Sequence, residues 1–189
     1  VAGLQKKLSA QQLISNKHIP PQYLIGDIEQ RQSLLQGLLD SDGECAKDNT
    51  IYFANKNKDL VDGVFLLAAS LGFKPLLEER PATLHTEDSE GNPVKVDKGT
   101  YWRGRFNASE AFSFPLFRIP RKQERCQKTR QGNRHSYRFI TDISPIPPKP
   151  MRCITVDNPT GLFLVSRSHI PTHNTHTGSL WVNHMVNFE

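Results

Sequence analysis

Apolar residues recur at helical spacing in two segments of the chain. The first covers residues 28–42, where one apolar face is formed by Ile28, Leu34, Leu35, Leu38 and Leu39. Asp27 stands where an N-cap is expected, and Gly43 is expected to end this helix in a left-handed conformation. Because glycine is costly inside a helix, Gly37 predicts that another backbone packs closely there. A second helix with a broad apolar face is predicted from about residue 58 to residue 71.

Strand patterns lie between and after these helices. Three strands are predicted over residues 50–54, 74–79 and 100–107, with a polar turn region at 87–93 before the last of them. Alternation along the last strand places four polar side chains on one face, Tyr101, Arg103, Arg105 and Asn107. This face is a candidate for reading bases and phosphates, and a plain solvent-exposed strand face is the alternative. Helices and strands in this order predict an α+β fold.

The C-terminal third has a β pattern. Residues 137–144 are strand-like and lead through a proline-rich stretch at 145–150. A hairpin is predicted beyond it, with Ile154 and Val156 on one strand, a turn at 158–161 and a second strand over 162–165. The hairpin would deliver the chain to Thr-His-Asn-Thr at 172–175. Residues 1–16 carry only a helical pattern of leucines.

The distribution of charge is more informative than its sum. The chain has 189 residues, 37% of them hydrophobic, which is enough for one or two small domains, and a net charge of +5. Residues 118–138 contain eight basic residues and one acid, so this segment accounts for the whole net positive charge of the chain. Such a basic segment is typical of a polyanion-binding surface, and a solvated loop is the alternative. Its candidate DNA contacts are Arg118, Arg121, Lys122, Arg125, Lys128 and Arg130.

The chain has no apolar run long enough for a membrane helix, so no membrane partner is expected. Its three cysteines, Cys45, Cys126 and Cys153, show no paired or metal-ligand spacing. This pattern indicates a reduced, cytoplasmic setting. Cys45 and Cys126 are expected only to pack or to be exposed.

Residues 35–43, Leu-Gln-Gly-Leu-Leu-Asp-Ser-Asp-Gly, resemble the signature of LAGLIDADG homing endonucleases. Residues 17–23 resemble the Lys-x-Ile-Pro segment that precedes a second such motif in nucleases carried by inteins. The resemblance implies a half-domain whose curved sheet lies in the DNA major groove. It also implies that Asp42 binds a metal and that Asp40 is structural.

Independently, a carboxylate at the end of a helix is disfavoured unless a cation joins it, and Mg²⁺ held by Asp42 and phosphate oxygens would meet that need. A core helix ending in a polar turn is the alternative.

A second chemistry is indicated at the end of the chain. Asn174 can attack its own main-chain carbonyl and cut the chain, provided that the Thr175 hydroxyl already holds the upstream segment as an ester. Residues 151–174 resemble the C-terminal splicing blocks of inteins. His173 is the expected proton donor to the departing amide, with His169 as a weaker candidate. Cys153 resembles the nucleophile of class 3 inteins, and a buried small hydrophobe is the alternative.

These resemblances imply a chain in four parts. Residues 1–16 are a linker from a preceding nuclease half, 17–130 a LAGLIDADG half-domain, 131–174 the C-terminal β-hairpin part of a Hint-type (all-β) splicing domain, and 175–189 a stub of host protein. Residues 175–183 resemble the phosphate-binding loop of phage terminase large subunits, which suggests a terminase ATPase host. The expected partners are double-stranded DNA, Mg²⁺, the missing N-terminal intein half and the host. The expected location is the cytoplasm of a bacterial or phage-infected cell.

Two alternatives remain. The nuclease part could have decayed to a domain that only binds DNA. The chain could also be a free-standing nuclease in which His-Asn-Thr is accidental. One half-domain supplies one catalytic acid, so efficient cleavage is expected only with a second motif helix.

Overall fold

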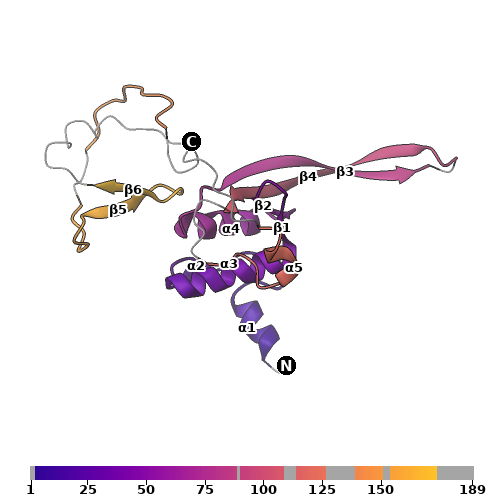
Figure 1. Cartoon of the computed structure of the whole chain (residues 1–189), viewed down its shortest axis with the longest axis horizontal. Coiled ribbons are helices and arrows are strands. Elements are labelled where there is room, and N and C mark those ends of the chain that lie inside the picture. The colour runs from indigo at the N-terminus through magenta and orange to yellow at the C-terminus, as the bar shows by residue number, and fades with distance from the viewer. Residues whose placement is uncertain (1–2, 89, 109–113, 127–138, 151–153, 174–189) are drawn as a thin grey trace. The chain divides into compact units, whose positions relative to one another are not determined.

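The computed structural model describes residues 3–88, 90–108, 114–126, 139–150 and 154–173 (Figure 1). The chain divides into two compact units, residues 1–130 and 131–189. Unit 1 contains five helices and a four-stranded sheet, and unit 2 contains a two-stranded sheet, among the described residues. None of the helices in the described ranges has the length and apolarity needed to cross a membrane.

Helix α3 (Ile28–Asp42) carries the nine-residue signature and forms as predicted. Asp27 caps it, since its carboxylate accepts a 2.7 Å hydrogen bond from the Gln30 amide. The predicted left-handed cap at Gly43 is wrong, because Gly43 is extended (φ −85°, ψ 155°) and begins strand β1 (Gly43–Cys45). Glycine is required there by space, since a Cβ would lie 2.6 Å from the Leu39 carbonyl oxygen.

Helix α4 (Lys58–Ser70) also forms as predicted and is capped by the Asn57 side chain. The same side chain donates 2.9 Å hydrogen bonds back to Asn16 and to the Lys17 carbonyl. Ile19 packs on α4 at Gly63, where a Cβ would lie 3.0 Å from Ile19 Cγ1. The Lys-x-Ile-Pro segment is therefore part of the folded unit. Two short helices flank it, α1 (Leu4–Ala10) and α2 (Pro21–Leu24).

The sheet of unit 1 is antiparallel, in the order β1-β2-β4-β3. Strand β2 (Thr50–Asn55) matches the prediction, whereas β3 (Leu76–Glu87) and β4 (Pro93–Asn107) are much longer than predicted. They form a hairpin that projects beyond the helices (Figure 1). Residues 80–86 and 93–99 are mostly exposed, and they are strands because they pair with each other across the hairpin. The register shifts beyond Pro81, opposite Gly99, which has a φ of +84°.

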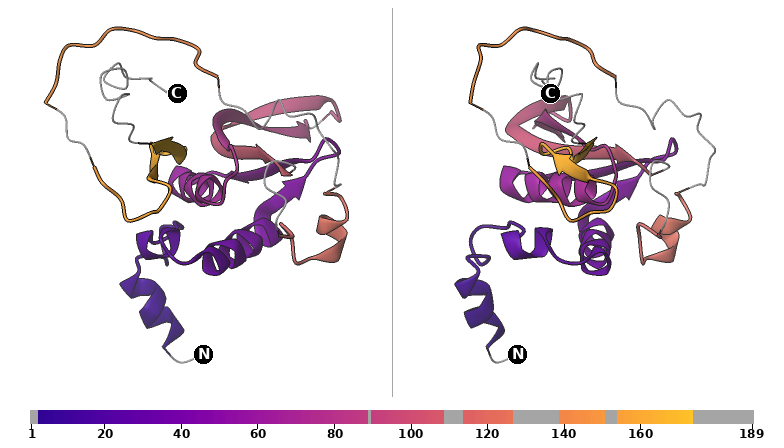
Figure 2. Two further views of the ribbon diagram at one scale, coloured as in Figure 1. Left: turned by 60° about the vertical axis from the view of Figure 1, so that its left-hand side comes forward. Right: turned by 90° about the vertical axis from the view of Figure 1, so that its left-hand side faces the viewer.

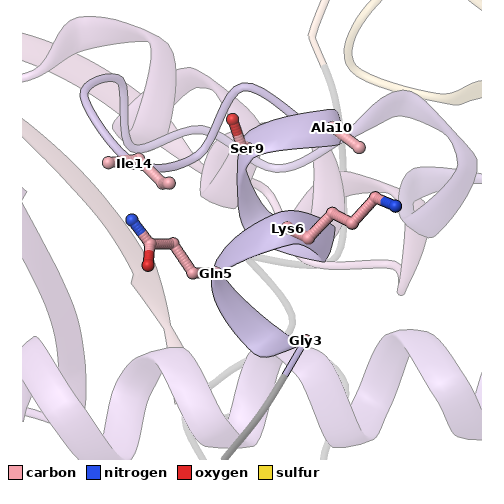
Figure 3. Close-up of a pocket in the computed structure, with 6 residues that line it drawn as sticks. All are labelled: Gly3, Gln5, Lys6, Ser9, Ala10 and Ile14. Carbon is pink, nitrogen blue, oxygen red and sulfur yellow. The ribbon is translucent and has the colours of Figure 1, made fainter.

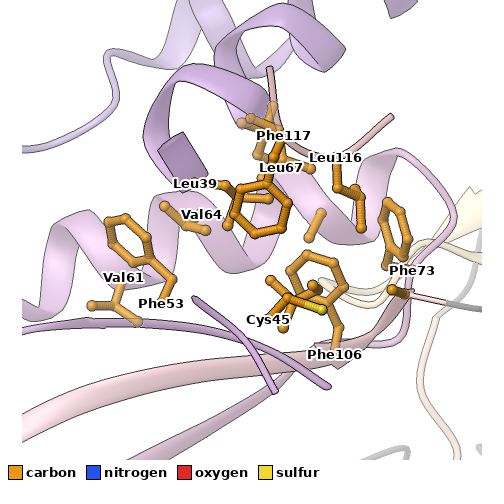
Figure 4. Close-up of a cluster of buried hydrophobic side chains, with 14 of the residues drawn as sticks. Leu39, Cys45, Phe53, Val61, Val64, Leu67, Phe73, Phe106, Leu116 and Phe117 are labelled. Atoms are coloured by element: carbon orange, nitrogen blue, oxygen red, sulfur yellow. The ribbon is translucent and has the colours of Figure 1, made fainter. Parts of the chain in front are cut away.

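The core of unit 1 lies between the sheet and helices α3 and α4 (Figures 2 and 4). Phe73 and Phe106 meet at its centre with ring centroids 4.6 Å apart. Phe117, near the short helix α5 (Pro120–Gln123), is also buried. The segment that begins the basic stretch is thus anchored in the core.

Unit 2 differs from the predicted hairpin. Strand β5 (Leu162–Val165) forms, but it pairs with β6 (Ile170–His173) and not with residues 154–156, which are irregular. Residues 139–144 also lack the predicted strand. Strand β6 supplies four residues in register with β5, from Ile170 opposite Val165 to His173 opposite Leu162. The turn at 158–161 does form, with the Gly161 amide 2.8 Å from the Asn158 carbonyl.

Candidate nucleic-acid interface and splice junction

One face of the four-stranded sheet bears the polar stripe that the sequence predicts. Trp102, Gly104 and Phe106 of β4 point toward α4 and the core, and Tyr101, Arg103 and Arg105 alternate with them. The cross-strand partners of Arg103 and Arg105 include Ala54 and Tyr52 of β2. Helices α3 and α4 lie on the opposite side of this sheet (Figure 2).

The two predicted arginines share a carboxylate that the sequence analysis did not identify. Glu78 of β3 accepts from Arg103 Nη2 at 2.8 Å and from Arg105 Nε at 2.6 Å. Arg80 lies 3.5 Å from the same carboxylate, so three guanidinium groups share one negative charge and the cluster keeps two positive charges. Hydrogen bonds from Arg103, and then from Arg105, lower the pKa of Glu78 to about 2. The cluster therefore keeps a net positive charge, which attracts phosphate.

Arg103 has further contacts that restrict its movement. Its guanidinium carbon lies 4.8 Å from the centre of the Tyr52 ring, a cation–π contact. The hydrogen bond to Glu78 raises the pKa of Arg103. Its Nε is buried without a hydrogen-bond partner among the described residues.

Asp42, the predicted metal ligand, is exposed at the last residue of α3. Asp40 is held by the protein instead, since its carboxylate accepts from the backbone amides of Arg118 (3.1 Å) and Ile119 (3.2 Å). The two acids thus lie in different environments, Asp40 bound by backbone amides and Asp42 exposed. No group of three or more metal-ligating side chains occurs in the described ranges. Asp42 alone supplies one hard oxygen donor suited to Mg²⁺, so further ligands would have to come from DNA or from a second motif helix.

Lys122 provides the cation at the end of α3 where the sequence analysis expected a metal. Its ammonium donates to the carbonyl oxygens of Leu39 (3.1 Å), Asp40 (2.7 Å) and Gly43 (2.8 Å). All three of its N–H groups are thereby used, and the positive charge lies at the negative end of the helix dipole. The expectation that Lys122 contacts DNA is therefore revised, because a phosphate would have to displace three backbone acceptors.

Arg118 is tied to the same helix. Its Nε donates to Gln36 Oε1 at 3.0 Å, while Gln36 Nε2 donates to the Pro115 carbonyl at 2.5 Å. Gln36 is buried, and its amide thus joins the motif helix to the segment that follows the sheet. In the described part of the basic segment, Arg121 and Arg125 are exposed. Lys128 and Arg130 lie outside the described residues.

The cysteines of unit 1 agree with the expected packing role. Cys45 and Cys126 are buried, and burial raises the pKa of both thiols. The two thiols also affect each other, since Cys126 lowers the pKa of Cys45 and Cys45 raises the pKa of Cys126. A shallow hollow on α1 is lined by Gly3, Gln5, Lys6, Ser9, Ala10 and Ile14 (Figure 3). It contains neither a carboxylate nor a thiol, so we assign it no chemistry.

The junction segment is described only up to His173, the last residue of β6. Cys153, Asn174 and Thr175 lie outside the described residues. His173 pairs with Leu162 across the hairpin, and its imidazole lies against Gly161. His169 is in the loop between the strands, with a left-handed backbone (φ 49°) and a buried Nδ1 that has no hydrogen-bond partner among the described residues.

Comparison with known proteins addresses both units. Residues 29–103 match a family model described as a LAGLIDADG-like domain. A protein named replicative DNA helicase DnaB, from Mycobacterium intracellulare, is 34% identical over 181 residues, which are 94% of this chain and 29% of that protein. This chain therefore spans less than a third of the length of the relative.

These matches give no support to a terminase host, a phage origin or a Hint-type domain. They do agree with the mixed helix and sheet architecture, so the α+β prediction is confirmed. The matched segment contains α3, α4 and most of the sheet, with Asp42 at the end of α3. Residues 29–103 are therefore similar to LAGLIDADG-like domains.

Proposed function

We propose that this chain is the C-terminal part of an intein that carries one half of a homing endonuclease. One observation carries the proposal: a LAGLIDADG-like domain lies within a chain of which 94% matches a protein named as a helicase. A nuclease-type domain inside a protein named for another activity is what an inserted, self-excising element would produce. The His-Asn-Thr sequence at 173–175 supplies the residues for its excision.

In the nuclease part, Asp42 would hold Mg²⁺ together with phosphate oxygens of DNA. The metal would stabilise the charge that develops on the phosphate during hydrolysis. The polar face of the sheet, with its Glu78–Arg103–Arg105 cluster, would position the backbone of the duplex. Apart from the helix's own backbone, no described atom lies within 4 Å of a Cβ built on Gly37, so the backbone expected to pack there is not part of this structure, and this side of α3 has room for a second motif helix. Efficient cleavage would need that second helix and its acid.

The nuclease proposal is tested on the intein with both nuclease halves. Asp42→Asn should abolish Mg²⁺-dependent cleavage of the DNA that spans the uninterrupted host gene, while binding is kept or strengthened. Glu90→Gln, an exposed acid at the tip of the β3–β4 hairpin, is the control and should cleave normally. Full cleavage by Asp42→Asn would rule out its metal-binding role. Binding without cleavage by the unaltered protein would favour a decayed nuclease.

In the splicing part, Cys153 would attack the upstream junction, and the upstream chain would pass from its thioester to the Thr175 hydroxyl as an ester. The Asn174 side-chain nitrogen would then bond to its own carbonyl carbon, breaking the bond to Thr175. His173 would give a proton to the departing nitrogen. An ester-to-amide shift at Thr175 would complete the ligated host.

The splicing proposal is tested on the full reading frame. Asn174→Ala should leave the branched ester or the unspliced precursor, and Cys153→Ser should block upstream cleavage while Asn174-dependent cleavage continues. Intact mass spectrometry distinguishes these products. Ligated flanks from Asn174→Ala would show that splicing does not depend on Asn174, whereas an unaltered precursor that never gives ligated flanks would leave a free-standing nuclease as the function.

A further inference from the structure

Gly161 and His173 are in direct contact across the β5–β6 hairpin. A Cβ built on Gly161 would lie 3.0 Å from His173 Nε2, 3.4 Å from Cδ2 and 3.8 Å from Cε1. Three atoms of the imidazole are therefore close to the one face of Gly161 where any other L-residue has its side chain. The pairing of Leu162 with His173 fixes this approach, since it places Gly161 next to the end of β6.

We propose that Gly161 is a positioning residue for the His173 imidazole, and through it for cleavage after Asn174. The inference rests on the proposed splicing function and deepens it. In that cleavage the Asn174 side-chain nitrogen forms a bond to the Asn174 carbonyl carbon and loses a proton, while the Thr175 nitrogen leaves and gains one. A proton donor serves this exchange only from the correct side and distance, because misplacement by about 1 Å can cost two orders of magnitude in rate.

Gly161 also has a local role that the test must separate. Its φ is +67°, and its amide donates to the Asn158 carbonyl at 2.8 Å to close the turn. An alanine at this position would strain the backbone as well as displace the imidazole. Asparagine tolerates the left-handed conformation better than alanine but still has a Cβ. A pure turn role therefore predicts that Gly161→Asn behaves almost normally, whereas a positioning role predicts that both variants are slow.

The experiment uses the full-length precursor and measures the first-order rate of cleavage after Asn174 by mass spectrometry. Gly161→Ala and Gly161→Asn should each slow this step by about tenfold or more. Upstream thioester formation at Cys153 should be unchanged and serves as the check on folding.

A double-mutant cycle then assigns the effect to His173. In a His173→Ala background, neither Gly161 substitution should slow the residual cleavage further. Independent, multiplying losses in the double variants, or a normal rate in Gly161→Asn, would overturn the inference and leave Gly161 with a turn role. Failure of the splicing proposal is distinct, since the unaltered precursor would then show no Asn174-dependent cleavage at all.

Discussion

The ammonium of Lys122 lies 2.7 Å from the carbonyl oxygen of Asp40, eighty-two positions away in sequence. This contact joins the motif helix to the segment that follows the sheet. In the other direction, the Asp40 carboxylate accepts hydrogen bonds from the Arg118 and Ile119 amides of the same segment. The last turn of α3, with Asp42 at its end, is therefore held on both sides.

Replacing Lys122 with methionine should destabilise unit 1 by about 2 kcal/mol. The change removes a cation from the negative end of a helix and leaves three carbonyl oxygens without their shared donor. Urea unfolding followed by circular dichroism measures the loss. Arg121→Met removes the same charge from an exposed site one residue earlier and should change stability little. Equal effects of the two substitutions would contradict a specific role for Lys122.

Exchanging glycines in α3 and at its end should give opposite results. Gly43→Ala should destabilise by about 1–3 kcal/mol, because its Cβ would meet Leu39 backbone atoms at 2.6 Å. Gly37→Ala should stabilise the isolated chain by up to about 1 kcal/mol, because the site is helical and open. In the protein with both nuclease halves, the same Gly37→Ala change should weaken cleavage if a second helix packs there. Thermal melts and a DNA cleavage assay test the pair.

Neutralising Glu78 should strengthen DNA binding. Glu78→Gln frees Arg103 and Arg105 from a shared carboxylate and adds one net positive charge to the polar face. The affinity for a DNA duplex should rise. The slope of log affinity against log salt should steepen by the amount that corresponds to about one additional phosphate contact. Glu79→Gln makes the same charge change at the neighbouring residue of β3 and is the control. No difference between the variants would mean that this face does not meet phosphate.

The same carboxylate predicts a dependence of stability on pH. The pKa of Glu78 is about 2 in the folded protein against an ordinary value of 4.5, so folding favours its ionised form. Its contribution should be complete above pH 4.5 and should be lost as the pH falls toward 2. Urea midpoints of the unaltered protein and of Glu78→Gln should therefore converge across this range. A constant difference between them would contradict the ion-pair assignment.

The exposed arginines of the basic segment should act on DNA binding alone. Arg121→Ala with Arg125→Ala should lower affinity for all duplexes alike and reduce the salt slope by about 2, with little change in stability. Arg118→Ala differs, because it also breaks the hydrogen bond to Gln36 and should lower the unfolding midpoint. Fluorescence anisotropy at several salt concentrations measures the first effect. A salt slope unchanged by the Arg121 and Arg125 substitutions would contradict it.

The sequence by itself determined the local elements of unit 1. Asp27 and the apolar spacing defined α3, and the apolar face of residues 60–71 defined α4, because capping and helical periodicity act within a few residues. Alternation along β4 correctly put Arg103 and Arg105 on one face. The nine-residue signature at 35–43 also predicted the likeness to LAGLIDADG-like domains that residues 29–103 show.

Only the tertiary structure decided what these side chains contact. The partner of Arg103 and Arg105 is Glu78, twenty-five or more residues away, and the cation at the end of α3 is Lys122. In unit 2, β5 pairs with β6 over four residues, and the pattern of a single strand does not encode its partner. Contacts of this kind depend on distances between segments remote in sequence, and those distances exist only after the sheet and helices have packed.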